Sequence, residues 1–129
     1  MKPFGLTKDE RLNSQLIIDR LFAAGNNSMA AFPLRVVWMV SERQPEDTLP
    51  PARMMVSVPK KRFRHAVDRN RMKRQVREAF RLNKHLLWDA LGSDKRVDVA
   101  FISITDQLMD SRVVHKAVVK ALLRISERL

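Results

Sequence analysis

The stretch ARMMVSVPKKRFRHAVDRNRMKRQVREAFRLN, from Ala52 to Asn83, contains the two elements that decide the fold. Its first residues, as far as Val58, are rich in types that favour strands, and Pro59 ends them. From Ala66 onward, apolar residues recur at intervals of three and four, which predicts a helix that ends near Asn83. A strand followed by an amphipathic helix indicates a sheet with helices packed on it.

The predicted helix has two distinct faces when its residues are placed at about 100° each. One sector of about 100° is apolar and is predicted to pack on the sheet; it holds Met72, Val76, Ala79 and Phe80. The neighbouring sector is polar and holds an amide and five cations: Asn70, Lys73, Arg74, Arg77, Arg81 and Lys84. Like charges three or four residues apart repel, and solvated helix faces usually mix signs, so we interpret this stripe as a surface for phosphate groups.

The remaining elements follow from apolar periodicity, turn residues and caps. We expect a helix that starts at Asn13 or Ser14 and ends before Gly25, strands at residues 32–40 and 96–104, a loop at 41–51, and a helix from a Ser111 cap to about Arg128. A cap at Thr7 would start the first helix earlier, and residues 83–91 either continue the basic helix or form a short one. The order predicts one α+β domain over residues 1–129, a two-layer sandwich with a mixed sheet.

The charge of the chain is concentrated in one segment. The 129 residues carry a formal charge of +11, and residues 60–84 hold eleven Lys or Arg against two acids. A surface this basic favours a polyanion, with nucleic acid as the first candidate and an anionic membrane surface as the second. The chain has no cysteine, no apolar run long enough for a membrane span and no signal-peptide pattern, so we expect a cytoplasmic protein that uses no disulfide or thiolate.

Several short motifs of the basic segment occur together in a fixed order. They are Pro59-Lys60-Lys61, Ala66-Val67, Arg69-Asn70-Arg71, Lys73-Arg74, Arg77-Glu78 and Phe80-Arg81. This series resembles the signature of the bacterial ribonuclease P protein, and looser similarity covers most of the chain. The resemblance implies a two-layer α/β sandwich with a left-handed βαβ crossover, a hand that spacing alone would not have suggested.

The resemblance also implies a function. The protein would be a subunit of ribonuclease P, helping a catalytic RNA to remove the 5′ leader from precursor tRNA. The partner RNA would hold the Mg²⁺ ions and perform the hydrolysis, so the protein itself would have no catalytic or metal site, and one protein would bind each RNA. By the same similarity, the expected RNA-binding residues are Lys60, Lys61, Arg62, Arg69, Asn70, Arg71, Lys73, Arg74, Arg77 and Arg81.

A cleft between the first helix and the sheet would hold the leader, lined by Ile18, Phe22 and Val56. The family commonly has an aromatic residue where this chain has Ile18, and an aliphatic side chain cannot stack on a base. From the residues alone, Phe22 is more readily a core residue of an apolar helix face than a ligand contact.

Two other functions fit the basic helix. A structural RNA-binding protein of the ribosomal type would share the helix but would not need the leader cleft. An autonomous nuclease would need clustered carboxylates or histidines, and neither the three histidines nor Asp94, Asp98, Asp106 and Asp110 have the spacing of a metal site. We therefore expect RNA binding without protein-borne catalysis.

Overall fold

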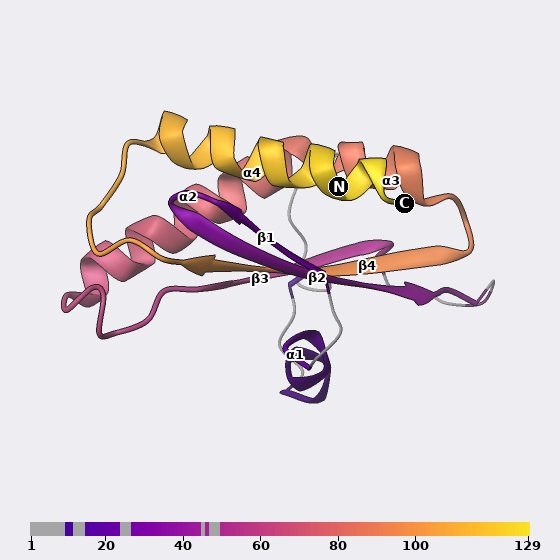
Figure 1. Cartoon of the computed structure of the whole chain (residues 1–129), viewed down its shortest axis with the longest axis horizontal. Coiled ribbons are helices and arrows are strands. Elements are labelled where there is room, and N and C mark those ends of the chain that lie inside the picture. The colour runs from indigo at the N-terminus through magenta and orange to yellow at the C-terminus, as the bar shows by residue number, and fades with distance from the viewer. Residues whose placement is uncertain (1–9, 12–14, 24–26, 45, 47–49) are drawn as a thin grey trace.

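A four-stranded mixed sheet lies at the centre of the molecule (Figure 1). The computed structural model describes residues 10–11, 15–23, 27–44, 46 and 50–129. The strands, in their spatial order, are β1 (Asn27–Ala31), β2 (Leu34–Glu42), β4 (Lys95–Ser103) and β3 (Ala52–Ser57). Neighbouring strands are antiparallel except β3 and β4, which run parallel. The mixed sheet expected from the sequence is confirmed.

Three helices cover one face of this sheet: α2 (Ala66–Asn83), α3 (His85–Leu91) and α4 (Ser111–Glu127). Their apolar sides form the main core with the sheet, and Met72, Phe80 and Leu122 are fully buried in it. Burial of each such side chain contributes roughly 1.5–3 kcal/mol to folding. The apolar face predicted for α2 is confirmed, because Met72, Val76, Ala79 and Phe80 are all buried.

The short helix α1 (Gln15–Leu21) lies on the opposite face of the sheet (Figure 1). Leu21 packs there with Val37 and Ala100 in a second, smaller core. The two-layer description therefore applies to the sheet and α2 to α4, and α1 adds a partial layer beneath it. The capping residues predicted for this helix (Thr7, Asn13, Ser14) and Gly25 lie outside the described residues.

The parallel connection from β3 to β4 passes through α2 and α3, as the predicted βαβ unit requires. Its left-handed sense stays a prediction from the family resemblance. In the register of this pair, Arg53 lies opposite Asp98, and their side chains form a buried ion pair with N–O distances of 2.9 and 3.1 Å. This accounts for Asp98, which belongs to no metal cluster among the described residues.

Two details differ from the sequence prediction, and one open alternative is decided. The strand β1 was not predicted, because four of its five residues are at least partly exposed and the polar Asn27 and Ser28 hide the pattern. Of the two alternatives for residues 83–91, the short separate helix is confirmed, as α3. The N-cap of α4 is Asp110 rather than Ser111: its Oδ1 accepts a hydrogen bond from the backbone N–H of Arg112 at 2.8 Å.

The prediction for Lys84 was wrong. Its side chain is 2% exposed and donates to both carboxylate oxygens of Glu10, so it does not belong to the cationic stripe. Lys84 is the residue between α2 and α3. The placement of residues at about 100° each assumes one continuous helix, so it does not hold at this junction. Next to Glu10, Arg11 makes an isolated parallel bridge with Met54 along the outer edge of β3.

Candidate RNA interface

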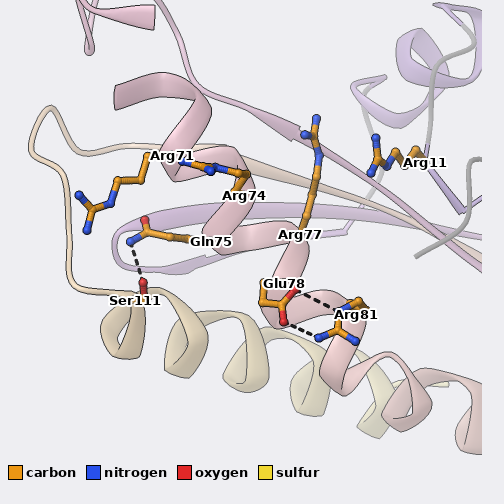
Figure 2. A pocket seen from close by; sticks show the side chains of 8 residues that line it. All are labelled: Arg11, Arg71, Arg74, Gln75, Arg77, Glu78, Arg81 and Ser111. Carbon is orange, nitrogen blue, oxygen red and sulfur yellow. Dashed lines mark hydrogen bonds and ion pairs between the residues drawn. The ribbon is translucent and has the colours of Figure 1, made fainter. Parts of the chain in front are cut away.

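A hollow lined by arginines runs along the outer side of α2 (Figure 2). Its volume is about 590 Å³. Four arginines at intervals of three and four leave α2 along this side, and a fifth comes from the N-terminal segment. The lining residues are Arg11, Arg71, Arg74, Gln75, Arg77, Glu78, Arg81 and Ser111.

The position of α2 relative to α4 is fixed by Gln75. Its Nε2 donates to Ser111 Oγ at 3.0 Å and to the carbonyl oxygen of Met109 at 2.9 Å, and Figure 2 shows the first of these bonds closing one side of the hollow. The arginines therefore project from a helix that is held at both its apolar and its polar side. A preorganised group of guanidinium forks suits phosphate oxygens, which they bind in pairs.

The cations of the hollow are close enough to affect one another. Partial burial and the neighbouring charge of Arg11 lower the pKa of Arg77 below its ordinary value. An arginine keeps its charge at physiological pH even so, and a bound anion would relieve the repulsion.

One acid lines this hollow, Glu78, and it is paired. Arg81 Nε donates to Glu78 Oε2 at 3.0 Å and its Nη2 donates to Oε1. The hydrogen bond from Arg81 lowers the pKa of the Glu78 carboxyl, and the same bond raises the pKa of Arg81. Part of the charge of Arg81 is thus neutralised within the protein.

The predicted RNA-binding residues of α2 fall into two groups. Arg71, Arg74, Arg77 and Arg81 line the hollow, and Asn70 is exposed on the same helix. Arg69 is turned back instead: its Nη1 donates to the carbonyl oxygens of Phe63 and Arg64 at 2.8 and 3.2 Å, so it stabilises the turn that leads into α2. Lys73 is half-buried and does not line the hollow.

A second hollow, of about 500 Å³, lies on the α1 face of the sheet. It is formed by the end of α1, strands β1, β2 and β4, and the loop before α2. Its walls combine apolar and cationic side chains: Leu21, Phe22, Ala23, Ser28, Arg35, Val37, Pro59, Lys61, Arg62, Ile102, Ser103 and Ile104.

Phe22 is 46% exposed in this hollow, so the reading of Phe22 as a core residue was wrong. Lys61, predicted to bind RNA near the surface of the basic helix, lines this hollow instead, together with Arg62, and exposed Lys60 precedes them. Arg62 is held in place because its Nη1 donates to the carbonyl oxygen of Ile104 at 3.1 Å. An exposed aromatic ring beside fixed cations is the arrangement that holds single-stranded nucleic acid.

The prediction placed Val56 on the wrong face of the sheet. Val56 packs against the main core under α2 and α4, whereas its neighbour Met55 packs against the smaller core near α1. Ile18 is half-buried on α1 and is not among the residues that line the hollow. Sequence reasoning missed two cations of these hollows, Arg11 and Arg35. For Arg35 the available signal was a charged residue between the apolar Leu34 and Val36 of a predicted strand.

Other chemistry is not visible in the described part of the chain. Within it, no three His, Cys, Asp or Glu side chains gather closely enough to hold a metal ion. None of its helices combines the length and apolar character needed to cross a bilayer. The two hollows are therefore the candidate sites, one on each side of the sheet.

A family model for ribonuclease P matches residues 6–126 of this chain. The chain belongs to the ribonuclease P protein family. A ribonuclease P protein component from Porphyromonas gingivalis is 46% identical over 124 residues, which cover 95% of this chain and 88% of the relative. The ribonuclease P protein component of Chlorobaculum tepidum is 36% identical over 104 residues, covering 75% and 66%.

Solved ribonuclease P proteins share the fold. The protein from Staphylococcus aureus superposes with a TM-score of 0.66 at 22% identity, over 92% of this chain and 95% of that one. The protein from Thermotoga maritima also gives 0.66 at 22% identity, over 89% and 96%. The α+β fold predicted from the sequence is thereby confirmed.

Family membership also confirms the predicted function. The chain is a protein subunit of ribonuclease P, the RNA–protein enzyme of tRNA processing, and ribonuclease P RNA is its partner. Nothing favours the ribosomal-type alternative.

Proposed function

We propose that the two hollows bind different parts of the RNA in the ribonuclease P reaction. The arginine hollow of α2 binds the phosphate backbone of ribonuclease P RNA. The hollow under α1 binds the single-stranded 5′ leader of precursor tRNA. The protein thereby adds affinity for the substrate, works in the cytoplasm, and acts with one copy per RNA.

The observation that carries this proposal is the exposure of Phe22 in a hollow with three cations. The Phe22 ring is accessible to a ligand in this hollow, since the side chain is 46% exposed there. Unpaired bases fit, because every base has a face that stacks on an aromatic ring, while Arg35, Lys61 and Arg62 match the phosphates between bases. Paired RNA would not present its bases to the ring.

The catalytic chemistry is proposed to come from the RNA. The arginines of both hollows can neutralise phosphate but cannot take a proton from water at neutral pH, since arginine stays charged. Mg²⁺ is proposed to be held by the partner RNA, which has the oxygen ligands that this ion prefers. Neutralising the backbone near those ions lowers the metal concentration that the RNA needs.

Reconstitution tests the proposal. The protein, ribonuclease P RNA and precursor tRNA are mixed at low Mg²⁺, and cleavage of the leader is followed. We expect cleavage only when protein and RNA are both present, and a tighter protein-dependent affinity for precursor tRNA than for mature tRNA. Equal affinity for the two tRNAs would contradict a leader site. Cleavage by the protein alone would contradict the proposal that the RNA performs the catalysis.

A further inference from the structure

Helix α4 carries a row of cations that the RNA surface described above does not include. Every fourth residue from 112 to 128 is basic and exposed: Arg112, Lys116, Lys120, Arg124 and Arg128. At a rise of 1.5 Å per residue, the row extends over about 24 Å. The helix contains a single acid, Glu127, at its end. Like charges at this interval repel, so the row is unfavourable to the helix on its own.

The charged side chains at the two ends of the row have partners within the protein. Arg112 pairs with Asp110 at 3.3 Å, and the guanidinium of Arg128 lies 5.9 Å from the ring centre of Trp38. In contrast, Lys116, Lys120 and Arg124 form no hydrogen bond or ion pair within the portion of the chain that the structure describes. The middle of the row is therefore available to an external anion.

An exposed aromatic ring stands beside the middle of this row. Phe32 is 63% exposed at the turn between β1 and β2, although Ala31 and Pro33 on either side are buried. The turn is anchored, because the backbone N–H of Ile104 donates to the carbonyl oxygen of Pro33 at 3.0 Å. Phe32, Val113, Lys116 and Lys120 line a hollow of about 250 Å³, together with Ala31 and Ala117.

This hollow faces away from the arginines of α2. The side of α4 that meets α2 is marked by Ser111, bonded to Gln75, and by His115, whose Nε2 lies 3.2 Å from Asn83 Nδ2. Lys120 lies toward the β1–β2 turn instead, and Lys116 lies between the two sides, since it lines both this hollow and the one formed with Asn83 and His115. None of the residues that line the arginine hollow of α2 lines the hollow beside Phe32.

We propose that the α4 row and Phe32 form a second RNA-binding surface, which takes an unpaired strand of the partner RNA. An unpaired base stacks on Phe32, and the flanking phosphates pair with Lys116 and Lys120. The proposal rests on the family's RNA partner and is independent of the leader site, because the two surfaces share no residue.

The chemistry favours RNA over the other occupants of a basic surface. A second copy of this chain would bring its own cationic row against this one. An anionic bilayer also attracts lysines beside an exposed aromatic ring, but membership of the ribonuclease P protein family already gives this chain an RNA partner. Alternation of base and phosphate accounts for both features, since it supplies a stacking face and a charge at neighbouring positions.

The first experiment measures the dissociation constant of the full chain with ribonuclease P RNA, without tRNA, at several salt concentrations. Replacing both lysines in K116Q/K120Q should weaken binding about tenfold at low salt and make the salt slope shallower by about 1.4. Phe32→Ala should weaken binding about tenfold without changing the slope, because it removes stacking but no charge. Lys95→Gln, an exposed lysine at the start of β4, is the control and should have no effect.

The second experiment locates the RNA. The chain has no cysteine, so Lys116→Cys provides a single thiol to which a hydroxyl-radical source can be attached. Radicals from this position should cut ribonuclease P RNA at a site different from that cut from Arg74→Cys. Lys95→Cys should cut it weakly or not at all. Unfolding in urea checks that each variant is folded.

Each alternative has a distinct result. Unchanged affinity and slope in K116Q/K120Q would overturn the proposal and show that the row is only solvated. Unchanged RNA affinity together with lost self-association in sedimentation would assign the surface to a second copy. Unchanged RNA affinity with weaker binding to phosphatidylserine vesicles would assign it to a membrane. Failure of the leader test with precursor tRNA would leave this surface unaffected.

Discussion

The ammonium group of Lys84 lies 2.8 and 2.7 Å from the two carboxylate oxygens of Glu10, with both side chains almost fully buried. Lys84 also lies 4.9 Å from the ring centre of Trp88. The pair joins positions 74 residues apart and holds Glu10 against the junction of α2 and α3. Arg11 is thereby kept at the edge of the arginine hollow, so a buried ion pair supports an exposed binding site.

Removing one member of this pair should be costly. Lys84→Met leaves the Glu10 carboxylate buried without its cation, and we expect a loss of about 3 kcal/mol in the free energy of unfolding. Urea unfolding followed by circular dichroism measures it. The exposed Lys95→Met serves as the control and should change stability by less than about 0.5 kcal/mol. The double variant E10L/K84M should recover part of the loss, and no recovery would show that the packing rather than the charge matters.

The arginines of α2 should determine the salt dependence of RNA binding. Arg74→Ala removes an exposed cation from the hollow, and the slope of log affinity for ribonuclease P RNA against log salt should become shallower by about 0.7–0.9. Filter binding over a range of salt concentrations measures it. Arg69→Ala is the comparison: because Arg69 stabilises a turn, it should lower stability more than it changes the slope. An unchanged slope for Arg74→Ala would mean that the hollow is merely hydrated.

The hollow under α1 should distinguish precursor from mature tRNA. Phe22→Ala removes the exposed ring and should weaken binding of the reconstituted enzyme to precursor tRNA about tenfold, the effect of one lost base stack. Affinity for mature tRNA should not change. Leu82→Ala, another exposed apolar residue at the end of α2, is the matched control. An equal loss of affinity for both tRNAs would show that Phe22 does not contact the leader.

The acid of the arginine hollow should oppose RNA binding. Glu78→Gln frees Arg81 from its ion pair and should increase affinity for ribonuclease P RNA a few-fold, with a steeper salt slope. Since the hydrogen bond from Arg81 lowers the pKa of Glu78, the pair stabilises the fold above the ordinary pKa of a glutamate and loses this effect as the pH falls through the lowered value. Asp89→Gln, an exposed acid on α3, is the control and should leave the affinity unchanged. Weaker binding by Glu78→Gln would show that Glu78 positions Arg81 for RNA.

The sequence was sufficient for the features that depend on local pattern. The apolar face of α2 follows from the spacing of Met72, Val76 and Phe80, and each of them is buried. The strand before Pro59 and the arginines at intervals of three and four are local for the same reason. Such features require only that a helix or strand be recognised and its faces assigned.

The features that were not predicted from the sequence depend on residues far away in the chain. Lys84 was predicted to lie on the polar stripe of the helix because helical spacing contains no information on Glu10, which is 74 residues away in the chain. Val56 was placed on the wrong face because the strand has apolar residues on both sides, so alternation does not say which side meets α1. The cationic row of α4 recurs at intervals of four beside an apolar stripe, and such a row is also typical of the solvent side of an amphipathic helix.

The bridge between Arg11 and Met54 has a consequence for solubility. Strand β3 is an outer strand of the sheet and contains two methionines and a valine; among the described residues, its outer edge is bridged only at Met54, by Arg11. Open edges of this kind invite strand-to-strand association between molecules. Arg11 places a charged side chain at one position of that edge, a feature that opposes such association.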